Sequence, residues 1–171
     1  MDFQTLIKTR YSVRAYTSDP VEDKKLEAVL EAARLAPTAA NRQPVQIIVV
    51  HTEGREAQLK RVYGRDWFVQ APLVIAVCGL VDAGWQRDRY DGKSYLDVDA
   101  AIVMDHLILA ATEQGLGTCW IAAFDPHAAR EVLGLPEDVE PIVFTPLGYA
   151  ADAPKEKKRK PLDALVRYER W

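Results

Sequence analysis

The sequence predicts a single α+β domain, and three observations indicate this class. The chain has 171 residues, 49% of them hydrophobic and 27% charged, which is enough for one domain with a sizeable core. Short apolar runs rich in β-branched residues are typical of buried strands. Longer segments of helical periodicity separate these runs. The same order of elements also fits a doubly wound parallel sheet, an alternative that the pattern alone leaves open.

Two helices are expected in the N-terminal part of the chain. Phe3, Leu6 and Ile7 form the apolar face of a short first helix. The next start signal reads Asp19-Pro20-Val21-Glu22 and combines a carboxylate suited to an N-cap, a proline suited to the first helical position and a glutamate suited to the third. We therefore expect a second helix that starts here and ends at about Leu35.

The remaining elements alternate between strands and helices. Four apolar runs are expected as strands: residues 47–50, 73–78, 118–124 and 142–147. Three further helices are expected: residues 54–63, residues 96–114, and a helix that Asp125-Pro126 starts and Leu133-Gly134 ends. The helix over residues 96–114 is apolar around most of its circumference, so we expect a second subunit to cover part of it. A central position across a single sheet would also explain this pattern.

A stretch of five residues after the first helix suits a phosphate ligand. It reads Arg10-Tyr11-Ser12-Val13-Arg14. Arginine pairs bidentately with phosphate oxygens, and a serine hydroxyl adds a donor at short range, so the combination fits a phosphomonoester. The ordinary alternative is a helix end whose basic residues complement the helix dipole.

A polar loop with two prolines follows the second helix. It reads Ala36-Pro37-Thr38-Ala39-Ala40-Asn41-Arg42-Gln43-Pro44. The first proline disfavours helical geometry at Ala36, and the second favours an extended Gln43. The Asn and Gln amides carry the donors and acceptors that recognition of a uracil-like ring edge requires. They suit hydrogen bonds to their own backbone equally well.

Motifs for several other chemistries are missing. The pair Gly115-x-Gly117 has Trp120 at the third glycine position and leads from a helix into a strand, the reverse of a dinucleotide-binding turn. The three histidines are too dispersed for a metal site, and no serine lies in a nucleophile elbow. Cys78 and Cys119 lack metal-binding spacing and are expected to be buried thiols. The absence of an acid, base or nucleophile constellation is informative if a bound cofactor carries the chemistry.

Charge and hydropathy restrict the partners. The formal net charge of −3 argues against bulk attraction to nucleic acid or to an acidic membrane. No segment reaches the roughly 18 apolar residues of a membrane span. The first five residues are too polar to open a secretory signal, so we expect a cytoplasmic protein with neither a nucleic-acid nor a membrane partner.

Four segments in this order resemble the FMN-dependent nitroreductases, specifically the small single-domain members of that family. The segments are Arg10 to Arg14, Ala36 to Pro44, Gly115-Leu116-Gly117-Thr118-Cys119-Trp120-Ile121-Ala122-Ala123-Phe124, and Lys157-Lys158-Arg159-Lys160-Pro161-Leu162. The resemblance covers almost the whole chain. It implies one domain over residues 1–171, with a mixed, mostly antiparallel central sheet wrapped by helices. It also implies a homodimer with an exchanged C-terminal arm, in which residues from about 150 to 171 pack on the partner subunit.

The resemblance further implies an FMN site. Arg10 and Ser12 match positions that hold the phosphate and ribityl chain, and Arg14 matches a basic position beside the pyrimidine edge. The other positions that match the cofactor site are Tyr11, Pro37, Thr38, Asn41 and Gln43, the last three on a loop that often contacts the flavin from the neighbouring subunit. Backbone N–H groups of Ala122 and Ala123 match donors that face flavin N5 and O4, where relatives carry glutamate or glycine.

The basic tail would be an ordinary solvated charge run without this resemblance. Within it, Lys157 and Arg159 match a Lys-x-Arg pair that holds the same phosphate as Arg10. A shift by one residue, to Lys158 and Lys160, fits as well. We expect the two basic segments to close around the phosphate only in the dimer.

The implied activity is that of an FMN-dependent oxidoreductase. It transfers hydride from NADH or NADPH through flavin N5, in a ping-pong cycle, to a quinone, a nitroaromatic or a related acceptor. No protein side chain has a catalytic role in this scheme, and no metal takes part. Residues 82–95 form either a flexible cover over the flavin or a surface excursion, and the candidate substrate contacts are Trp67, Phe68 and Tyr90. The alternative is a flavin-binding or storage module without NAD(P)H turnover.

Overall fold

The computed structural model describes residues 1–171. Its centre is a four-stranded sheet in the order β1-β2-β4-β3. The strands are β1 (Val45–His51), β2 (Leu73–Leu80), β3 (Gly117–Thr118) and β4 (Val139–Gly148). All three neighbouring pairs are antiparallel, so the doubly wound parallel alternative is wrong and the α+β class is confirmed.

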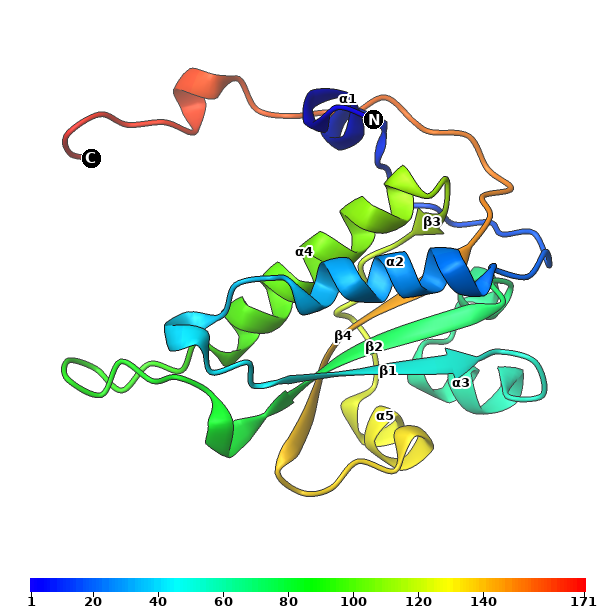
Figure 1. The fold of residues 1–171 in the computed structure, drawn as a ribbon, viewed down its shortest axis with the longest axis horizontal. Coiled ribbons are helices and arrows are strands. Elements are labelled where there is room, and N and C mark those ends of the chain that lie inside the picture. The colour runs from blue at the N-terminus through cyan, green and yellow to red at the C-terminus, as the bar shows by residue number, and fades with distance from the viewer.

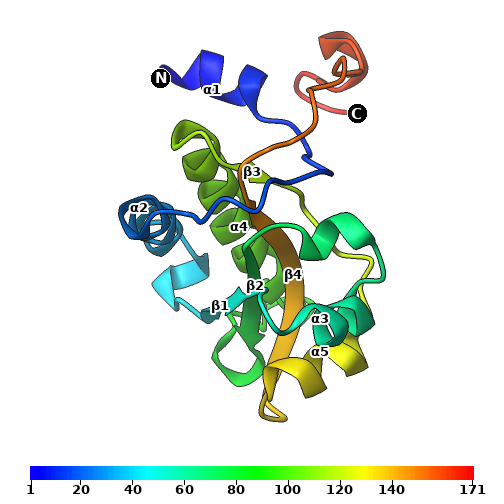
Figure 2. The ribbon, with the colours of Figure 1, turned by 90° about the vertical axis from the view of Figure 1, so that its right-hand side faces the viewer.

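Helices cover both faces of the sheet, and Figures 1 and 2 show the three layers. One face carries α2 (Asp23–Arg34) and α4 (Leu96–Glu113), and the other carries α3 (Glu56–Val62) and α5 (Pro126–Leu133). Side chains alternate along β2, so Ile75 belongs to the first core and Val74 to the second. A short helix, α1 (Phe3–Thr9), lies beyond the sheet at the C-terminal end of α4.

The long apolar helix α4 lies centrally across the sheet. This is the second of the two explanations given above for its apolar circumference. It packs between α2 and the sheet, and Val103, Met104 and Leu107 are buried there. Its outer side is still partly apolar, because Val98 remains 41% exposed and Leu109 is half-buried. No helix of the molecule combines the length and the apolarity needed to cross a bilayer.

The second helix begins later than predicted. Its N-cap is Glu22, so the predicted start at Asp19 is wrong. The Thr17 N–H donates to the Tyr149 carbonyl at 2.9 Å, and the Tyr149 hydroxyl donates to the Glu22 carboxylate at 2.5 Å. These contacts with the end of β4 hold the segment outside the helix. The helix end near Leu35 agrees with the prediction.

The strand predicted over residues 118–124 is mostly wrong, because only Gly117–Thr118 forms a ladder with β4. The next residue, Cys119, would face Pro146, which has no N–H to donate. The Cys119 N–H instead donates to Thr145 Oγ1 at 3.0 Å. The chain therefore leaves the sheet at the point where the next predicted site residues follow.

Candidate functional site

The stretch from Arg10 to Arg14 runs out of α1 in an extended conformation and lies along β3. Arg10 is the C-cap of α1, with φ −52° and ψ 131°. The Val13 N–H donates to the Thr118 carbonyl at 2.9 Å, and Ser12 pairs with Thr118 in an isolated parallel bridge. Gly117 permits this approach, since a Cβ there would lie 2.7 Å from Val13 Cγ2. The buried Val13 thus fixes Ser12 and Arg14 on either side of it.

A carboxylate that the sequence reasoning missed anchors this stretch from the other side. Asp152 accepts the backbone N–H of Arg14 through Oδ2 at 2.8 Å. The Tyr11 hydroxyl donates to the Asp152 carbonyl at 2.9 Å and to Oδ1 at 3.1 Å. Burial and the neighbouring Asp152 carboxylate raise the pKa of Tyr11, so this hydroxyl remains a donor at neutral pH. The start of the C-terminal arm is therefore tied to the N-terminal stretch.

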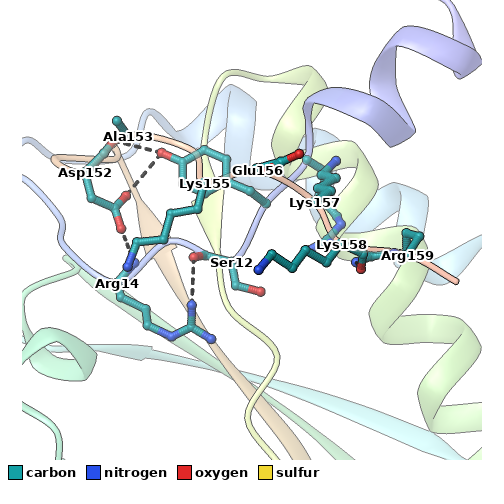
Figure 3. A pocket seen from close by; sticks show the side chains of 11 residues that line it. Ser12, Arg14, Asp152, Ala153, Lys155, Glu156, Lys157, Lys158 and Arg159 are labelled. Atoms are coloured by element: carbon teal, nitrogen blue, oxygen red, sulfur yellow. Dashed lines mark hydrogen bonds between the residues drawn. The ribbon is translucent and has the colours of Figure 1, made fainter.

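The two segments enclose a half-open cavity of about 210 Å³ (Figure 3). Basic residues dominate its lining, which is Arg10, Tyr11, Ser12, Arg14, Asp152, Ala153, Lys155, Glu156, Lys157, Lys158 and Arg159. Six cationic side chains face two carboxylates in a chain of net charge −3. The positive charge is thus concentrated locally, as a site for a small polyanion requires.

The basic residues of the arm have different roles. Lys157 Nζ donates to the Ile7 carbonyl at 3.0 Å and to the Lys8 carbonyl, so it binds the C-terminal end of α1. Burial lowers the pKa of Lys157, and the nearby charges of Arg10 and Arg159 lower it further. In Figure 3 the Lys158 side chain extends from the arm in the direction of Ser12.

These contacts lie within one chain. The expectation that the two basic segments meet only in the dimer is therefore wrong, because α1, the stretch that follows it and the arm already form the cavity in the single subunit. The backbone N–H of Ser12 has no acceptor in the chain. A free amide donor among arginine and lysine side chains is the donor set that a phosphate group requires.

The polar loop after α2 lies at the other end of the molecule, away from this cavity (Figure 1). Ala39–Asn41 form a single 3₁₀ turn. The predicted extended Gln43 is wrong, since its φ is 52°. Its N–H donates to Thr38 Oγ1 at 2.9 Å and its amide Nε2 donates to the Asn41 carbonyl at 3.3 Å. The loop thus satisfies part of its own hydrogen-bonding capacity. It does not contribute to the Arg10 cavity of the same subunit.

The loop after β3 presents free backbone donors. Ile121 exchanges two hydrogen bonds with Phe144, of 2.9 and 3.0 Å, and this bridge anchors the loop to β4. Ala122 and Ala123 follow it in exposed positions, and neither N–H has an acceptor in the chain. Cys119, earlier on the same loop, is a buried free thiol, and so is Cys78, as predicted.

The three candidate substrate contacts have different surroundings. Phe68 is fully buried in the core against Phe144, a placement that keeps it from any ligand. Trp67 is half-buried and meets Tyr63 edge-on at 5.5 Å. Tyr90 is 80% exposed within the segment of residues 82–95. That segment is an ordered hairpin-like excursion, held together by hydrogen bonds from one arginine, Arg87, to the side chains of Asp91 and Tyr95.

The fold and the cavity define a class of protein: a small α+β domain with a basic anion site between its N-terminal stretch and its C-terminal arm. The sequence model of the Nitroreductase family matches residues 7–64 and 53–149, so the chain belongs to that family. The resemblance stated above is thereby confirmed, and the protein is an oxidoreductase.

Individual relatives agree with this assignment. A crystal structure of a nitroreductase family protein from Clostridium difficile 630 has a TM-score of 0.92 and 41% identity, with all of both chains covered. The FMN reductase [NAD(P)H] of Bacillus subtilis (strain 168) is 31% identical, over 94% of this chain and 70% of its own. The NADH dehydrogenase of Thermus thermophilus is 29% identical, over 97% of this chain and 95% of its own.

Proposed function

We propose that the protein is an FMN-dependent NAD(P)H oxidoreductase whose basic cavity holds the FMN phosphate. The observation that carries this proposal is the convergence of Arg10, Ser12 and Arg159 on one cavity from opposite ends of the chain. The arginines supply planar donor forks for phosphate oxygens, and the Ser12 N–H supplies a backbone donor. Lys158 rather than Lys157 completes the set, because Lys157 is engaged by carbonyls of α1.

The remaining flavin contacts extend from this anchor. Arg14 Nη1 donates to the Ser12 carbonyl at 3.3 Å, which holds its guanidinium beside Ser12 in the lining of the cavity. Its positive charge there suits the pyrimidine side of a flavin, where it favours the reduced, anionic ring. The free N–H groups of Ala122 and Ala123 suit hydrogen bonds to N5 and O4. When bound, FMN supplies the hydride-transfer chemistry, and the protein supplies position and charge.

The complete site is shared between two subunits in this proposal. The loop with Pro37, Thr38, Asn41 and Gln43 cannot reach the Arg10 cavity of its own chain, so it serves the cavity of a partner. Two surfaces favour such a homodimer. The arm exposes four large apolar side chains, Leu162, Leu165, Tyr168 and Trp171, and the outer side of α4 exposes Val98.

The proposed cycle takes hydride from NADH or NADPH and delivers it to a quinone, a nitroaromatic or a related acceptor. Reduction of the bound flavin by NADH or NADPH, followed by its reoxidation by an acceptor, distinguishes this activity from flavin storage. The protein purified without added cofactor is expected to be yellow and to lose its flavin colour on anaerobic addition of NADH or NADPH. Quinones and nitroaromatics should then restore the colour. A chain that takes up no FMN contradicts the proposal, and bound flavin that neither nucleotide bleaches would leave only the storage module.

The phosphate assignment has its own test. The double variant Arg10→Ala/Arg159→Ala removes two charge-assisted contacts, so FMN binding should weaken about 100-fold or more. The control Lys24→Ala/Arg65→Ala removes the same charge from exposed positions outside the cavity and should leave the affinity nearly unchanged. Titration by quenching of flavin fluorescence measures both, and equal affinities for the two double variants would exclude the assignment.

A further inference from the structure

The start of α4 carries a buried carboxylate to which the proposed function gives no role. Asp99 is 1% exposed, and its Oδ1 accepts the backbone N–H of Ala39 at 2.8 Å. Its other oxygen, Oδ2, is buried and has no hydrogen-bond partner. A half-satisfied carboxylate is a costly group to bury, and an apolar side chain of the same size would serve packing better. The Ala39 N–H is therefore the only hydrogen-bond partner of this carboxylate in the chain.

Ala39 begins a turn that local preferences do not stabilise. The φ angles of Ala40, Asn41 and Gln43 are 51°, 53° and 52°, in the left-handed region that side chains with a Cβ disfavour. Residues 40–43 are exposed, so packing does not enforce this conformation. Their other short hydrogen bonds return to Thr38 and Ala39 within the same loop.

Only two hydrogen bonds connect the turn of residues 39–43 to other elements. One is the Ala39–Asp99 bond, and the other is a long contact of 3.5 Å from Arg42 Nη1 to the Gly84 carbonyl. The Ala39–Asp99 bond is short, charge-assisted and buried at its acceptor, so it is the stronger link. It joins the loop to α4, the longest and most buried helix of the fold.

We propose that Asp99 is a positioning residue, which holds the Thr38–Gln43 loop in the conformation that meets the cofactor of the partner subunit. This inference rests on the proposed shared FMN site. The carboxylate acts through the loop and touches no ligand itself. Without it, the left-handed turn loses its fixed point on α4 and relaxes, and the loop no longer presents the Thr38 and Asn41 side chains in one geometry.

Hydrogen exchange of the loop amides, together with FMN titration, tests this role in the full-length protein. Asp99→Ala should raise the exchange rates of the hydrogen-bonded amides of Ala39, Asn41, Arg42 and Gln43 about tenfold or more and weaken FMN binding about tenfold. Asp99→Asn keeps a carbonyl acceptor for Ala39 and should retain most of the protection and affinity. The matched control is Asp97→Ala, which removes an exposed carboxylate from the same helical turn and should change neither readout.

The possible results distinguish a failure of the Asp99 inference from a failure of the proposed function. Equal loop exchange in Asp99→Ala and Asp97→Ala overturns the inference, and so does faster exchange with unchanged FMN affinity. If Asp99→Ala does not fold, hydrogen exchange of the wild-type protein still tests the inference. The inference requires the Ala39 amide to exchange more slowly than the Ala40 amide. A wild-type protein that binds no FMN contradicts the proposed function instead, while the exchange comparison continues to report whether Asp99 holds the loop.

Discussion

Asp152 is an acidic residue inside a basic cavity, and its hydrogen bonds explain its presence there. It fixes the Arg14 backbone and the Tyr11 hydroxyl at the same time, so the stretch that follows α1 and the arm keep one relative position. Its charge opposes an anion in the cavity, whereas its hydrogen bonds order the donors that receive that anion. The two effects have opposite signs, and two variants can separate them.

Replacing Asp152 by alanine should weaken FMN binding about tenfold, because hydrogen bonds to a charged group contribute about 1.5–3 kcal/mol and their loss releases the arm. Asp152→Asn keeps an acceptor and removes the repulsive charge, so its affinity should equal or exceed that of the wild type. Fluorescence titration with FMN measures both. Asp163→Ala, on an exposed part of the arm, is the control. Tight binding by Asp152→Ala would show that ordering by this carboxylate does not matter.

Local patterns could predict that Arg10, Ser12 and Arg14 lie at an anion cavity, since arginine and serine side chains are donors suited to phosphate, whereas Arg159 was predicted only through the resemblance to the family. Asp152 could not be found this way. Its partner Tyr11 lies 141 positions away, and no periodicity links the two. The engagement of Lys157 by α1 was hidden for the same reason, because a run of lysines gives no sign of which ammonium is bound by the protein itself.

The close approach of the N-terminal stretch to β3 depends on a glycine. At Gly117 a Cβ would lie 2.7 Å from Val13 Cγ2 and 3.1 Å from Val13 Cβ, both on a buried side chain. Gly117→Ala should therefore destabilise the protein by about 1–3 kcal/mol and weaken FMN binding, because the stretch with Ser12 moves away. Adding Val13→Ala removes the clashing methyl groups and should restore part of both.

Urea unfolding and FMN titration measure these effects. Gly64→Ala is the matched control, since the nearest atom to its new Cβ would be the Lys60 carbonyl oxygen at 3.8 Å. If Gly117→Ala behaves like Gly64→Ala, the tight packing of the stretch against β3 has no energetic weight.

Helix α5 shows which elements the sequence specifies fully. Asp125 caps it by accepting the N–H groups of His127 and Ala128, and Gly134 ends it at φ 64°, as the local signals predict. The start of α2 carries an equally good local signal and still fails, because Tyr149 binds the preceding segment. The strand after Thr118 fails because Pro146, on another strand, cannot pair with it. Local signals hold where no distant partner competes with them.

The cap of α5 makes stability depend on pH. The Ala128 N–H, and then the His127 N–H, lower the pKa of Asp125 in the folded protein. A lowered folded pKa stabilises the protein above the unfolded value of about 3.9, and this contribution is lost as pH falls through the folded pKa. Asp125→Ala should lower the Tm by about 2–4 °C at pH 7.

The difference in Tm between wild type and Asp125→Ala should shrink below about pH 4. Asp125→Asn keeps an uncharged cap, so its Tm difference from Asp125→Ala should stay constant with pH. Thermal unfolding followed by circular dichroism at several pH values gives both comparisons. A wild-type advantage that persists unchanged at pH 2 would contradict the assigned role of the carboxylate.

More than half of the exposed large apolar side chains lie near the two termini. Phe3 and Ile7 on α1 are exposed, and so are Leu162, Leu165, Tyr168 and Trp171 on the arm, which extends past α1 and away from the sheet (Figure 1). Lys157 joins α1 to the arm. An arm that carries large apolar side chains and leaves its own domain is expected to be covered by another surface, and in the proposed homodimer a second copy of the chain supplies it.

The arm provides the last prediction. Leu162 begins a short 3₁₀ turn and Leu165 caps its end, and both lie outside the lining of the cavity, so changing both to serine leaves the proposed phosphate contacts in place. Burial of a leucine side chain contributes about 1.5–3 kcal/mol, so the double variant should weaken dimerisation about 100-fold or more. Asp163→Ser, between the two, is the control and should remain dimeric.

Analytical ultracentrifugation over a range of concentrations measures this change, and FMN titration of the same samples links assembly to the site. In a shared site, the dissociated Leu162→Ser/Leu165→Ser variant retains the phosphate cavity and loses the loop of its partner. FMN affinity should therefore fall with dilution in parallel with dissociation, and it should recover at concentrations that restore the dimer. A monomer that binds FMN as tightly as the wild type would show that one subunit contains the whole site, and the role given to the loop of residues 38–43 would then be wrong.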